Sequence, residues 1–474
     1  MSRIMPLSNI DAAWLHMDDP TNLMMVTGIL TFEDQINFDN FKTILEHRLL
    51  TFDRFRMRVV EPKVPFMPTY WEEDPLFDIN LHLHLVGLPE PAGQKELQDM
   101  ASDLLSTPLD YNKPLWQIHV IDNYQEGGAL IMRLHHSIAD GMALIFVLLS
   151  MTDMTPDAPL PSGTPPYLEK SGARRRHLLN GTLKAALKKS KGNVKKIGRA
   201  YKRFVSESLE VLVNPSHALE LTFDGTDHAY AAGRLMLRSN DPLTIFKGDL
   251  GVSKRAAWSR PLSLKDVKAI KKAAGATVND ILTSAMTGGL RRYMLARGDK
   301  VEGINFRAGI PINMRTPEEM GTLGNKFGLL FLDLPIGVAD PLERLVVVHD
   351  RMDALKNSKE GSVGLIILNG MGMTPAEIQR NLVGILAAKI TAVMTNVPGP
   401  PIPLYLAGNK IEDIMFWVPQ SGRVALGISI LSYANKVYLG VVTDEGLIPD
   451  PETIIEGFYQ EFDDLMELVA LAEG

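Results

Sequence analysis

A strongly basic segment in the middle of the chain limits the possible folds more than any other feature of the sequence. Residues 170–206 contain 13 lysines or arginines and no aspartate or glutamate, while the whole chain has a formal net charge of −7. The other residues therefore sum to −7 − 13 = −20. Five prolines between positions 156 and 166 precede the segment, as is typical of linkers. The pattern predicts acidic folded parts on either side of a basic connector.

The length of the chain supports the same division. At 474 residues the chain is too long for one ordinary hydrophobic core, and two domains of roughly 200 residues each are expected. Its 45% of hydrophobic and 22% of charged residues are typical of globular proteins and exclude a largely disordered chain. We predict an N-terminal domain over 1–160, a connector over 161–215 and a C-terminal domain over 216–474.

The basic connector has the spacing of amphipathic helices. Leu179, Leu183 and Leu187 recur every four residues within it. Two interpretations remain open: a solvated connector whose apolar face packs on the acidic domains, or a surface that docks on anionic lipid headgroups. Nucleic acid is not an expected partner, because no aromatic-lined reading surface accompanies the positive charge.

Residue types that are missing narrow the class of protein further. The chain has no cysteine, which excludes disulfides, thiolate metal sites and a cysteine nucleophile. No uninterrupted apolar stretch approaches the roughly 18 residues of a membrane-spanning helix. The first eight residues lack the apolar core of a signal peptide. We therefore expect a cytoplasmic protein that associates with membranes or lipid droplets only peripherally.

Strand and helix patterns alternate in both halves of the chain. Strands are predicted over 81–85, 304–312 and 327–336, and a hairpin over 424–444 that turns at Ala434-Asn435. Helices are predicted over 41–50, 263–275, 277–297 and 341–357. No glycine-rich phosphate loop follows any of the strands. The sequence therefore predicts an α/β fold.

The residues from His135 to Gly141 carry the strongest chemical signal. They lie between an apolar run over 129–134, which predicts a strand, and another over 142–151, which predicts a helix. A neutral imidazole at such a junction accepts a proton near pH 7, because its usual pKa is about 6.5. Adjacent strand residues point to opposite faces, so His135 and His136 do not face one metal ion and no metal site is expected. By itself the motif fits a general base or two buried structural histidines.

With four companion elements, the motif resembles the wax ester synthase/acyl-CoA:diacylglycerol acyltransferase family of CoA-dependent acyltransferases. The companions follow in the family's order over nearly the whole chain: Pro6-Leu7-Ser8 with Asp11 and Trp14, Pro114-Leu115-Trp116, Asn279-Asp280, and Asn396-Val397-Pro398-Gly399-Pro400. Gly324-Asn325 is a further, less specific match. Each element alone is weak evidence, and the five together in this order are strong evidence.

The resemblance implies roles for the motif residues. His136 corresponds to the general base, which removes the hydroxyl proton of an alcohol as its oxygen attacks the thioester of a fatty acyl-CoA. Such a base contributes about 10²–10⁴-fold to the rate. His135 is expected to support the site from the other face. Asp140 is expected to form an ion pair with an arginine, for which Arg133 and Arg315 are candidates.

Further roles follow for the other matched residues. Gly141 is expected to let a ligand or another backbone approach closely, or simply to start the helix. Asn279 is expected to donate a hydrogen bond to the oxyanion or to His136, with helix capping as the alternative. Substrate binding is expected from Pro114, Leu115, Trp116, Asp280, Asn396, Pro398 and Gly399. The alternatives are core packing for the Pro-Leu-Trp element, helix capping for Asp280, and a fixed turn for the element that begins at Asn396.

The resemblance also implies a fold and an activity. The fold would be two chloramphenicol-acetyltransferase-like α/β domains with mixed sheets, joined by the basic helical connector, with an active-site tunnel at their interface. The activity would be direct transfer of a long-chain fatty acyl group from acyl-CoA to a long-chain alcohol or a diacylglycerol, without a cofactor. Residues 170–206 would hold the enzyme on a membrane or lipid-droplet surface.

Two other functions remain open at this point. A condensation-domain-like enzyme that forms amides or esters shares the double histidine motif, and a lipid-binding protein without activity shares the fold. The intact His136 and Asp140 favour the active O-acyltransferase.

Overall fold

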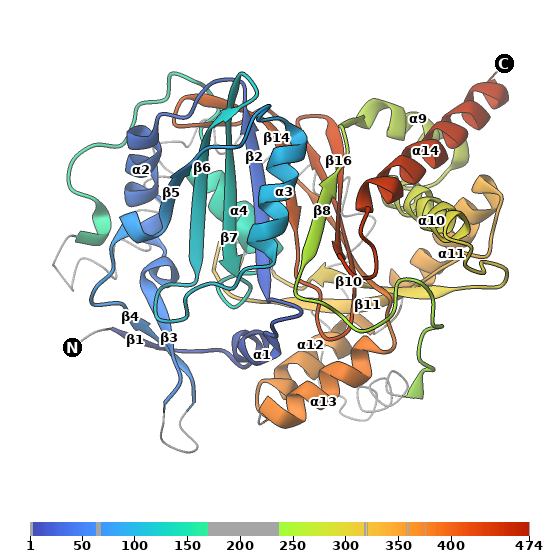
Figure 1. Ribbon diagram of the computed structural model, residues 1–474, viewed down its shortest axis with the longest axis horizontal. Helices are drawn as coiled ribbons and strands as arrows, with labels where there is room; N and C mark the ends of the chain where they lie inside the picture. Colours follow the sequence, from blue (N-terminus) through green and yellow to red (C-terminus); the bar gives the residue numbers. More distant parts are fainter. Residues whose placement is uncertain are drawn as a thin grey trace.

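Two mixed sheets form the centre of the molecule in the computed structural model (Figure 1). The structure describes residues 3–62, 68–168, 237–316, 319, 321–356, 358, 360–374 and 376–473. The predicted basic connector lies outside these residues, apart from its first few positions. The expectation of an α/β fold built on two mixed sheets is confirmed, because each sheet contains both parallel and antiparallel pairs.

The first sheet has six strands and belongs mainly to the N-terminal half. We call this sheet and the helices packed on it the N-terminal lobe. The strand order is β13-β14-β2-β7-β6-β5. These strands are β2 (Met25–Phe32), β5 (Leu83–Val86), β6 (Trp116–Tyr124), β7 (Gly127–His135), β13 (Tyr405–Leu406) and β14 (Asn409–Trp417). Its helices are α1 (Asn9–Met17), α2 (Phe38–His47), α3 (Gln94–Leu105) and α4 (Gly141–Met151).

The second sheet belongs entirely to the C-terminal half, which we call the C-terminal lobe. Its order is β11-β10-β12-β15-β16-β8, and β9 also pairs with β16. These strands are β8 (Lys254–Trp258), β9 (Leu262–Ser263), β10 (Phe306–Asn313), β11 (Phe327–Leu334), β12 (Ala392–Pro398), β15 (Leu426–Tyr433) and β16 (Lys436–Asp444). Its helices are α9 (Leu264–Ala274), α10 (Val278–Ala296), α11 (Pro341–Lys356), α12 (Glu360–Met371), α13 (Ala376–Ala387) and α14 (Pro451–Glu473).

A smaller sheet near the N-terminus completes the fold. It has the order β1-β4-β3 and consists of β1 (Ile4–Pro6), β3 (Met57–Val60) and β4 (Tyr70–Glu73).

One exchange between the halves was not anticipated from the sequence. Strand β14 comes from the C-terminal half but pairs antiparallel with β2, so that Phe416 lies opposite Gly28 and Ile414 opposite Leu30. The hydrophobic core of the N-terminal lobe accordingly includes Trp417. The two lobes are therefore connected by a shared sheet as well as by the contact between their surfaces.

The predicted elements agree closely with the structure where the sequence supplied end signals. Helix α9 begins after Ser263 and ends at Gly275, whose φ of 66° is left-handed as in a glycine C-cap. Thr277 caps α10 through its side chain. The hairpin between β15 and β16 turns at Ala434 and Asn435, both with positive φ.

Several predicted boundaries differ from the structure, two of them because local hydrogen bonds override the apolar pattern. Helix α2 begins three residues before the predicted start, since Asn37 and not a later residue accepts the capping bond from Asn40. Leu81 belongs to a short 3-10 helix that Asp78 caps, so β5 starts only at Leu83. Among the described residues, no helix has the length and apolar character needed to cross a bilayer.

Candidate active site

The double histidine motif lies where β7 turns into α4, and its two imidazoles have different surroundings. Strand β7 ends at His135, and the backbone N–H of this residue donates to the carbonyl of Leu115 at 2.9 Å. His136 follows in the turn, and its N–H donates to the carbonyl of Met24 at 2.8 Å. The carbonyl of His136 accepts a 2.8 Å bond from the Asn325 side chain. Neighbouring segments thus fix the backbone of both residues.

The imidazole of His136 lies in an aromatic pocket. It stacks on Trp14 with 4.1 Å between ring centroids, and it meets Phe327 edge-on at 5.9 Å. Only 6% of the residue is exposed, and its Nδ1 has no hydrogen-bond partner among the described residues. Burial lowers the pKa of His136, and the nearby Asp140 carboxylate partly opposes this effect. The imidazole is therefore neutral near pH 7, as a general base must be.

His135 points into the protein interior and serves the turn itself. Its Nδ1 accepts a 3.1 Å bond from the backbone N–H of Ser137 and lies 2.8 Å from the Ser137 hydroxyl. Tyr111 packs edge-on against the ring at 5.9 Å. Complete burial lowers the pKa of His135 to about 3. His135 is not among the residues that line the two cavities described below.

Asp140 connects the motif to the C-terminal lobe. Its Oδ1 caps α4 by accepting from the N–H of Ala143 at 2.9 Å. Its Oδ2 accepts from Arg315 Nη2 at 2.8 Å, from Arg315 Nε at 3.2 Å and from the N–H of Lys326 at 2.8 Å. Of the two candidate arginines, Arg315 is thus the partner. Arg133 instead bonds the Thr107 carbonyl and the Gln117 side chain.

A second arginine, which the sequence gave no reason to select, holds the turn from the other side. Arg54 Nη1 donates to the carbonyls of Ser137 and Ile138 at 3.0 and 2.8 Å. Its Nη2 forms a 2.8 Å ion pair with Asp11, whose side chain is fully buried. Asn325 bonds the other oxygen of Asp11 at 2.8 Å. Three consecutive carbonyls of the motif are therefore held by two side chains from distant parts of the chain.

His136 lines a large cavity that has about 1180 Å³ of atom-free space, including space open to solvent. Its wall includes Trp14 and Gly141 from the N-terminal lobe and Phe327, Asn396 and Val397 from the C-terminal lobe. Helices α12 and α13 complete it with apolar side chains, namely Leu368, Met371, Val383, Leu386 and Ala387. We call this space the catalytic cavity. Its wall is mainly apolar, which suits a hydrocarbon substrate, and its polar residues include His136, Asp140 and Asn396.

The structure places the Asn-Asp element next to the cavity but not in its wall. Asn279 Oδ1 accepts a 2.8 Å bond from the Nδ2 of Asn396, which lines the catalytic cavity. Asp280 is fully buried and forms a capping box with Thr277. Its Oδ2 also contacts His349 Nδ1 at 2.7 Å. Neither Asn279 nor Asp280 lines either large cavity.

The Pro-Leu-Trp element supports the motif strand from β6. Pro114, Leu115 and Trp116 are buried, and Leu115 provides the carbonyl that binds the N–H of His135. Trp116 donates its indole N–H to the carbonyl of Phe55 at 2.8 Å and lines a second cavity, within the N-terminal lobe.

The element from Asn396 to Pro400 covers the end of β12 and a fixed turn that follows it. A Cβ on Gly399 would lie 2.2 Å from the carbonyl oxygen of Ser432, so only glycine fits there. The N–H of Gly399 donates to the same carbonyl at 2.9 Å. Pro398 and Gly399 lie outside the walls of both large cavities, whereas Asn396 and Val397 line the catalytic cavity.

Comparison with known proteins assigns the chain to a family. Residues 7–282 match the model of the wax ester synthase/diacylglycerol acyltransferase catalytic domain. Residues 323–466 match the model of the C-terminal domain of the same family. A Mycobacterium tuberculosis protein named as a probable diacylglycerol O-acyltransferase, tgs1, is 26% identical over 98% of this chain and 96% of its own length.

Two solved structures have a fold similar to that of this chain. The wax ester synthase/diacylglycerol acyltransferase from Marinobacter aquaeolei VT8 has a TM-score of 0.69 and 20% identity, over 98% of this chain and 100% of that one. The first condensation domain of the calcium-dependent antibiotic synthetase has a TM-score of 0.60 and 13% identity, over 99% and 97% of the two chains. The expected chloramphenicol-acetyltransferase-like architecture is thereby confirmed.

Proposed function

Because this chain belongs to the wax ester synthase/diacylglycerol acyltransferase family and is an acyltransferase, we propose that it transfers a long-chain fatty acyl group from acyl-CoA to a long-chain alcohol or a diacylglycerol. The products would be a wax ester or a triacylglycerol. The observation that carries this proposal is the buried, neutral imidazole of His136 in the wall of a large apolar cavity.

In the proposed mechanism, His136 acts as the general base. A ring nitrogen removes the hydroxyl proton of the acceptor, and the oxygen attacks the thioester carbonyl carbon. The tetrahedral oxyanion collapses, the carbon–sulfur bond breaks, and the imidazolium returns the proton to the CoA thiolate. Direct transfer of this kind needs no cofactor and fits a chain without cysteine.

The neighbouring residues have proposed roles that follow from their contacts. Asp140 and Arg315 hold the motif against the C-terminal lobe. His135 fixes the turn through the backbone of Ser137. The Nδ2 of Asn396 carries two hydrogens, of which Asn279 binds one, and the other is available to the oxyanion. The amide pair is thus the proposed oxyanion site.

A coupled assay tests the proposal. Purified protein is incubated with palmitoyl-CoA and either hexadecanol or dioleoylglycerol, while free CoA and ester are measured in parallel. We expect His136→Ala to lower kcat by about 10²–10⁴-fold at unchanged thermal stability. His84→Ala, at a half-buried histidine on β5 that lines neither large cavity, is the matched control and should keep normal turnover. Normal turnover in His136→Ala would refute the mechanism.

We further propose that residues 170–206 bring the enzyme to the surface of a membrane or lipid droplet inside the cell, where both substrates partition. The support is their charge of 13 lysines and arginines without a carboxylate. The fraction of protein that floats with anionic liposomes should fall when salt is added and in the variant Lys188/Lys189/Lys195/Lys196→Glu. Binding that neither salt nor these substitutions reduce would contradict an electrostatic attachment.

A further inference from the structure

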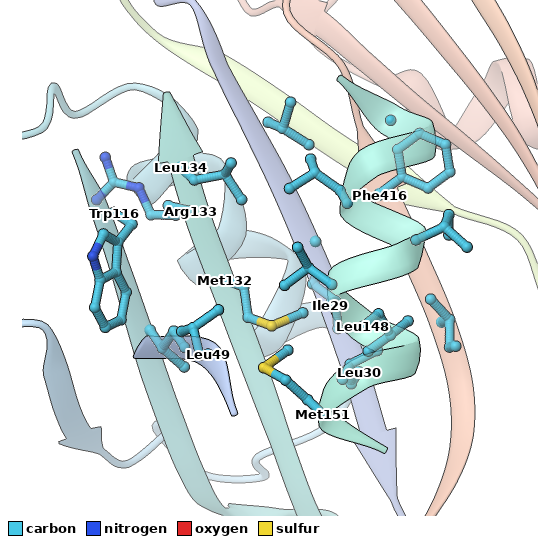
Figure 2. A pocket seen from close by; sticks show the side chains of 18 of the residues that line it. Ile29, Leu30, Leu49, Trp116, Met132, Arg133, Leu134, Leu148, Met151 and Phe416 are labelled. Atoms are coloured by element: carbon cyan, nitrogen blue, oxygen red, sulfur yellow. The ribbon is translucent and has the colours of Figure 1, made fainter. Parts of the chain in front are cut away.

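The N-terminal lobe contains a second cavity that the mechanism above does not use (Figure 2). It has about 850 Å³ of atom-free space and lies between the six-stranded sheet and α4. Its wall is almost entirely apolar. The guanidinium of Arg133, one of the polar groups in this wall, points away from the cavity in Figure 2 and bonds Gln117 at 3.3 Å. We call this space the lobe cavity.

The sheet side of the lobe cavity is built from rows of side chains that share one face. One row runs across four strands as Phe416, Gly28, Met132 and Ile118, which are paired in register from β14 through β2 and β7 to β6. All four residues line the cavity. Three of them carry large apolar side chains and the fourth carries none. The space in this row exists because position 28 is a glycine.

The backbone does not require a glycine at position 28. Its φ is outside the left-handed region, and a Cβ there would lie 3.7 Å from Met132 Cε and from the carbonyl oxygen of Met415. These are ordinary van der Waals distances. A glycine inside a strand lowers stability and marks places where a ligand approaches closely. The glycine leaves room at this point of the wall for the Met132 methyl group and for an occupant of the cavity.

The lobe cavity adjoins the catalytic cavity. Gly141, Val397 and Phe416 line both spaces. Gly141 is the first residue of α4 and follows Asp140 directly, and a Cβ on it would have no atom within 4 Å. Gly141 thus leaves open space where the two cavities meet, and a chain that starts at a carbonyl beside His136 would enter the lobe cavity at this point.

We propose that the lobe cavity holds the fatty acyl chain of acyl-CoA and that Gly28 sets the longest chain that it accepts. This inference rests on the proposed transfer from acyl-CoA. The ligand chemistry follows from the wall, which offers apolar contact over its length; Arg133, the charged residue among the described ones that line it, directs its guanidinium to Gln117 and the Thr107 carbonyl. A saturated hydrocarbon chain matches such a wall, because it makes no hydrogen bonds that the cavity would leave unsatisfied.

The dimensions agree with a long acyl chain. One face of α4 lines the cavity from Gly141 to Met151, ten residues apart, which corresponds to about 15 Å of helix. An extended carbon chain advances about 1.2 Å per bond, so this length takes roughly twelve bonds. Gly28 lies two residues beyond Val26 on β2, about 7 Å farther from the motif. A side chain at position 28 would therefore close the cavity partway along its length.

Substitution at position 28 tests the proposal through chain-length preference. Turnover is measured with acyl-CoA substrates from butyryl to stearoyl and with hexadecanol as acceptor. We expect Gly28→Leu to lower the ratio of kcat/KM for palmitoyl-CoA over butyryl-CoA by about 10-fold or more. The reason is that each methylene excluded from an apolar site weakens binding of the transition state. Gly28→Ala should change the ratio less and in the same direction. Met151→Ala, at the other end of α4, should instead favour stearoyl-CoA over palmitoyl-CoA.

Controls separate a filled cavity from a damaged sheet. Thr27→Val changes the neighbouring residue of β2, which is buried but does not line the cavity, and should leave the ratio unchanged. An unchanged ratio in folded Gly28→Leu would overturn the proposal. So would an equal loss of turnover with butyryl-CoA and palmitoyl-CoA.

A binding experiment makes the outcome independent of the proposed function. His136→Ala protein is titrated with cis-parinaric acid, a fluorescent fatty acid, with and without Gly28→Leu. We expect the added leucine to weaken binding by about 10-fold or more. If no ester forms in any assay, the proposed function fails, while weakened binding still supports a fatty chain in the lobe cavity. Equal binding with and without the leucine would overturn the inference even if ester forms.

Discussion

The ion pair between Asp140 and Arg315 allows a quantitative test of how the two lobes hold the active site. The exposed fractions of the two side chains are 7% and 3%, and Asp140 Oδ2 accepts three hydrogen bonds, two of them from Arg315. Arg315→Met removes the cation and leaves a buried carboxylate without its partner. Removing one member of a buried pair costs about 3–5 kcal/mol, whereas replacing both members is often nearly neutral.

The matched variants follow from the second role of Asp140. Its Oδ1 caps α4, and an asparagine retains that capping bond while removing the charge. We therefore expect Arg315→Met to lower the free energy of unfolding by about 3–5 kcal/mol. The double variant Asp140→Asn/Arg315→Met should recover most of that loss.

Unfolding by urea, followed by tryptophan fluorescence, measures the difference. Trp14 stacks on His136, so the signal includes the site itself. Turnover with palmitoyl-CoA is recorded on the same samples, because a site that has lost its contact with the C-terminal lobe should also lose activity. Equal losses of stability in the single and double variants would show that Arg315 stabilises the fold through its bonds to the Thr322 and Gly324 carbonyls and not by neutralising Asp140. The reasoning on the ion pair would then be wrong.

Four further predictions follow from the site. Because burial lowers the pKa of His136, kcat/KM should stay constant as the pH falls through 6.5 and decline only below it; a decline centred above 6.5 would contradict this. Burial lowers the pKa of His135 from 6.5 to about 3, so the unfolded chain binds the extra proton in that range and stability should fall as the pH drops from 6.5 toward 3. The decline should be shallower in His135→Gln, measured by thermal unfolding against pH. Gly399→Ala places a Cβ 2.2 Å from the Ser432 carbonyl oxygen and should lower the melting temperature by several degrees, whereas an unchanged value would show that the turn adapts. Trp14→Leu removes the ring that stacks on His136 and should lower kcat more than it changes KM for acyl-CoA, which steady-state kinetics would show.

The sequence predicted those parts of the fold whose causes are local. Ser263, Gly275 and Thr277 mark the helix ends where the structure has them. The Ser263 side chain makes no capping bond, whereas Gly275 and Thr277 act as caps, which depend on residues a few positions apart. Ala434-Asn435 marks the hairpin for the same reason. The motif from His135 to Gly141 was likewise placed correctly between a strand and a helix.

The site was predicted only in part. Its chemical centre was identified because the double histidine motif occurs with four companion elements in the family's order, and the family comparison agrees with that resemblance. Arg54 gave no signal, since it binds the motif through backbone carbonyls that any sequence would have. Arg315 was one of two candidates, and only contact across the lobes distinguished it from Arg133.

What the sequence by itself determined is therefore the kind of chemistry and the local elements, since both depend on residues close together in the chain. Tertiary structure alone decided the partners of the motif and the shape of the substrate space. Strand β14 joins β2 from nearly 400 residues away, which places Phe416 opposite Gly28. Long-range pairing of this kind depends on the packing of the whole core and leaves no local pattern. The glycine at position 28 is an ordinary strand residue in the sequence, and it becomes a gap in a wall only when the two adjacent strands bring Phe416 and Met132 beside it.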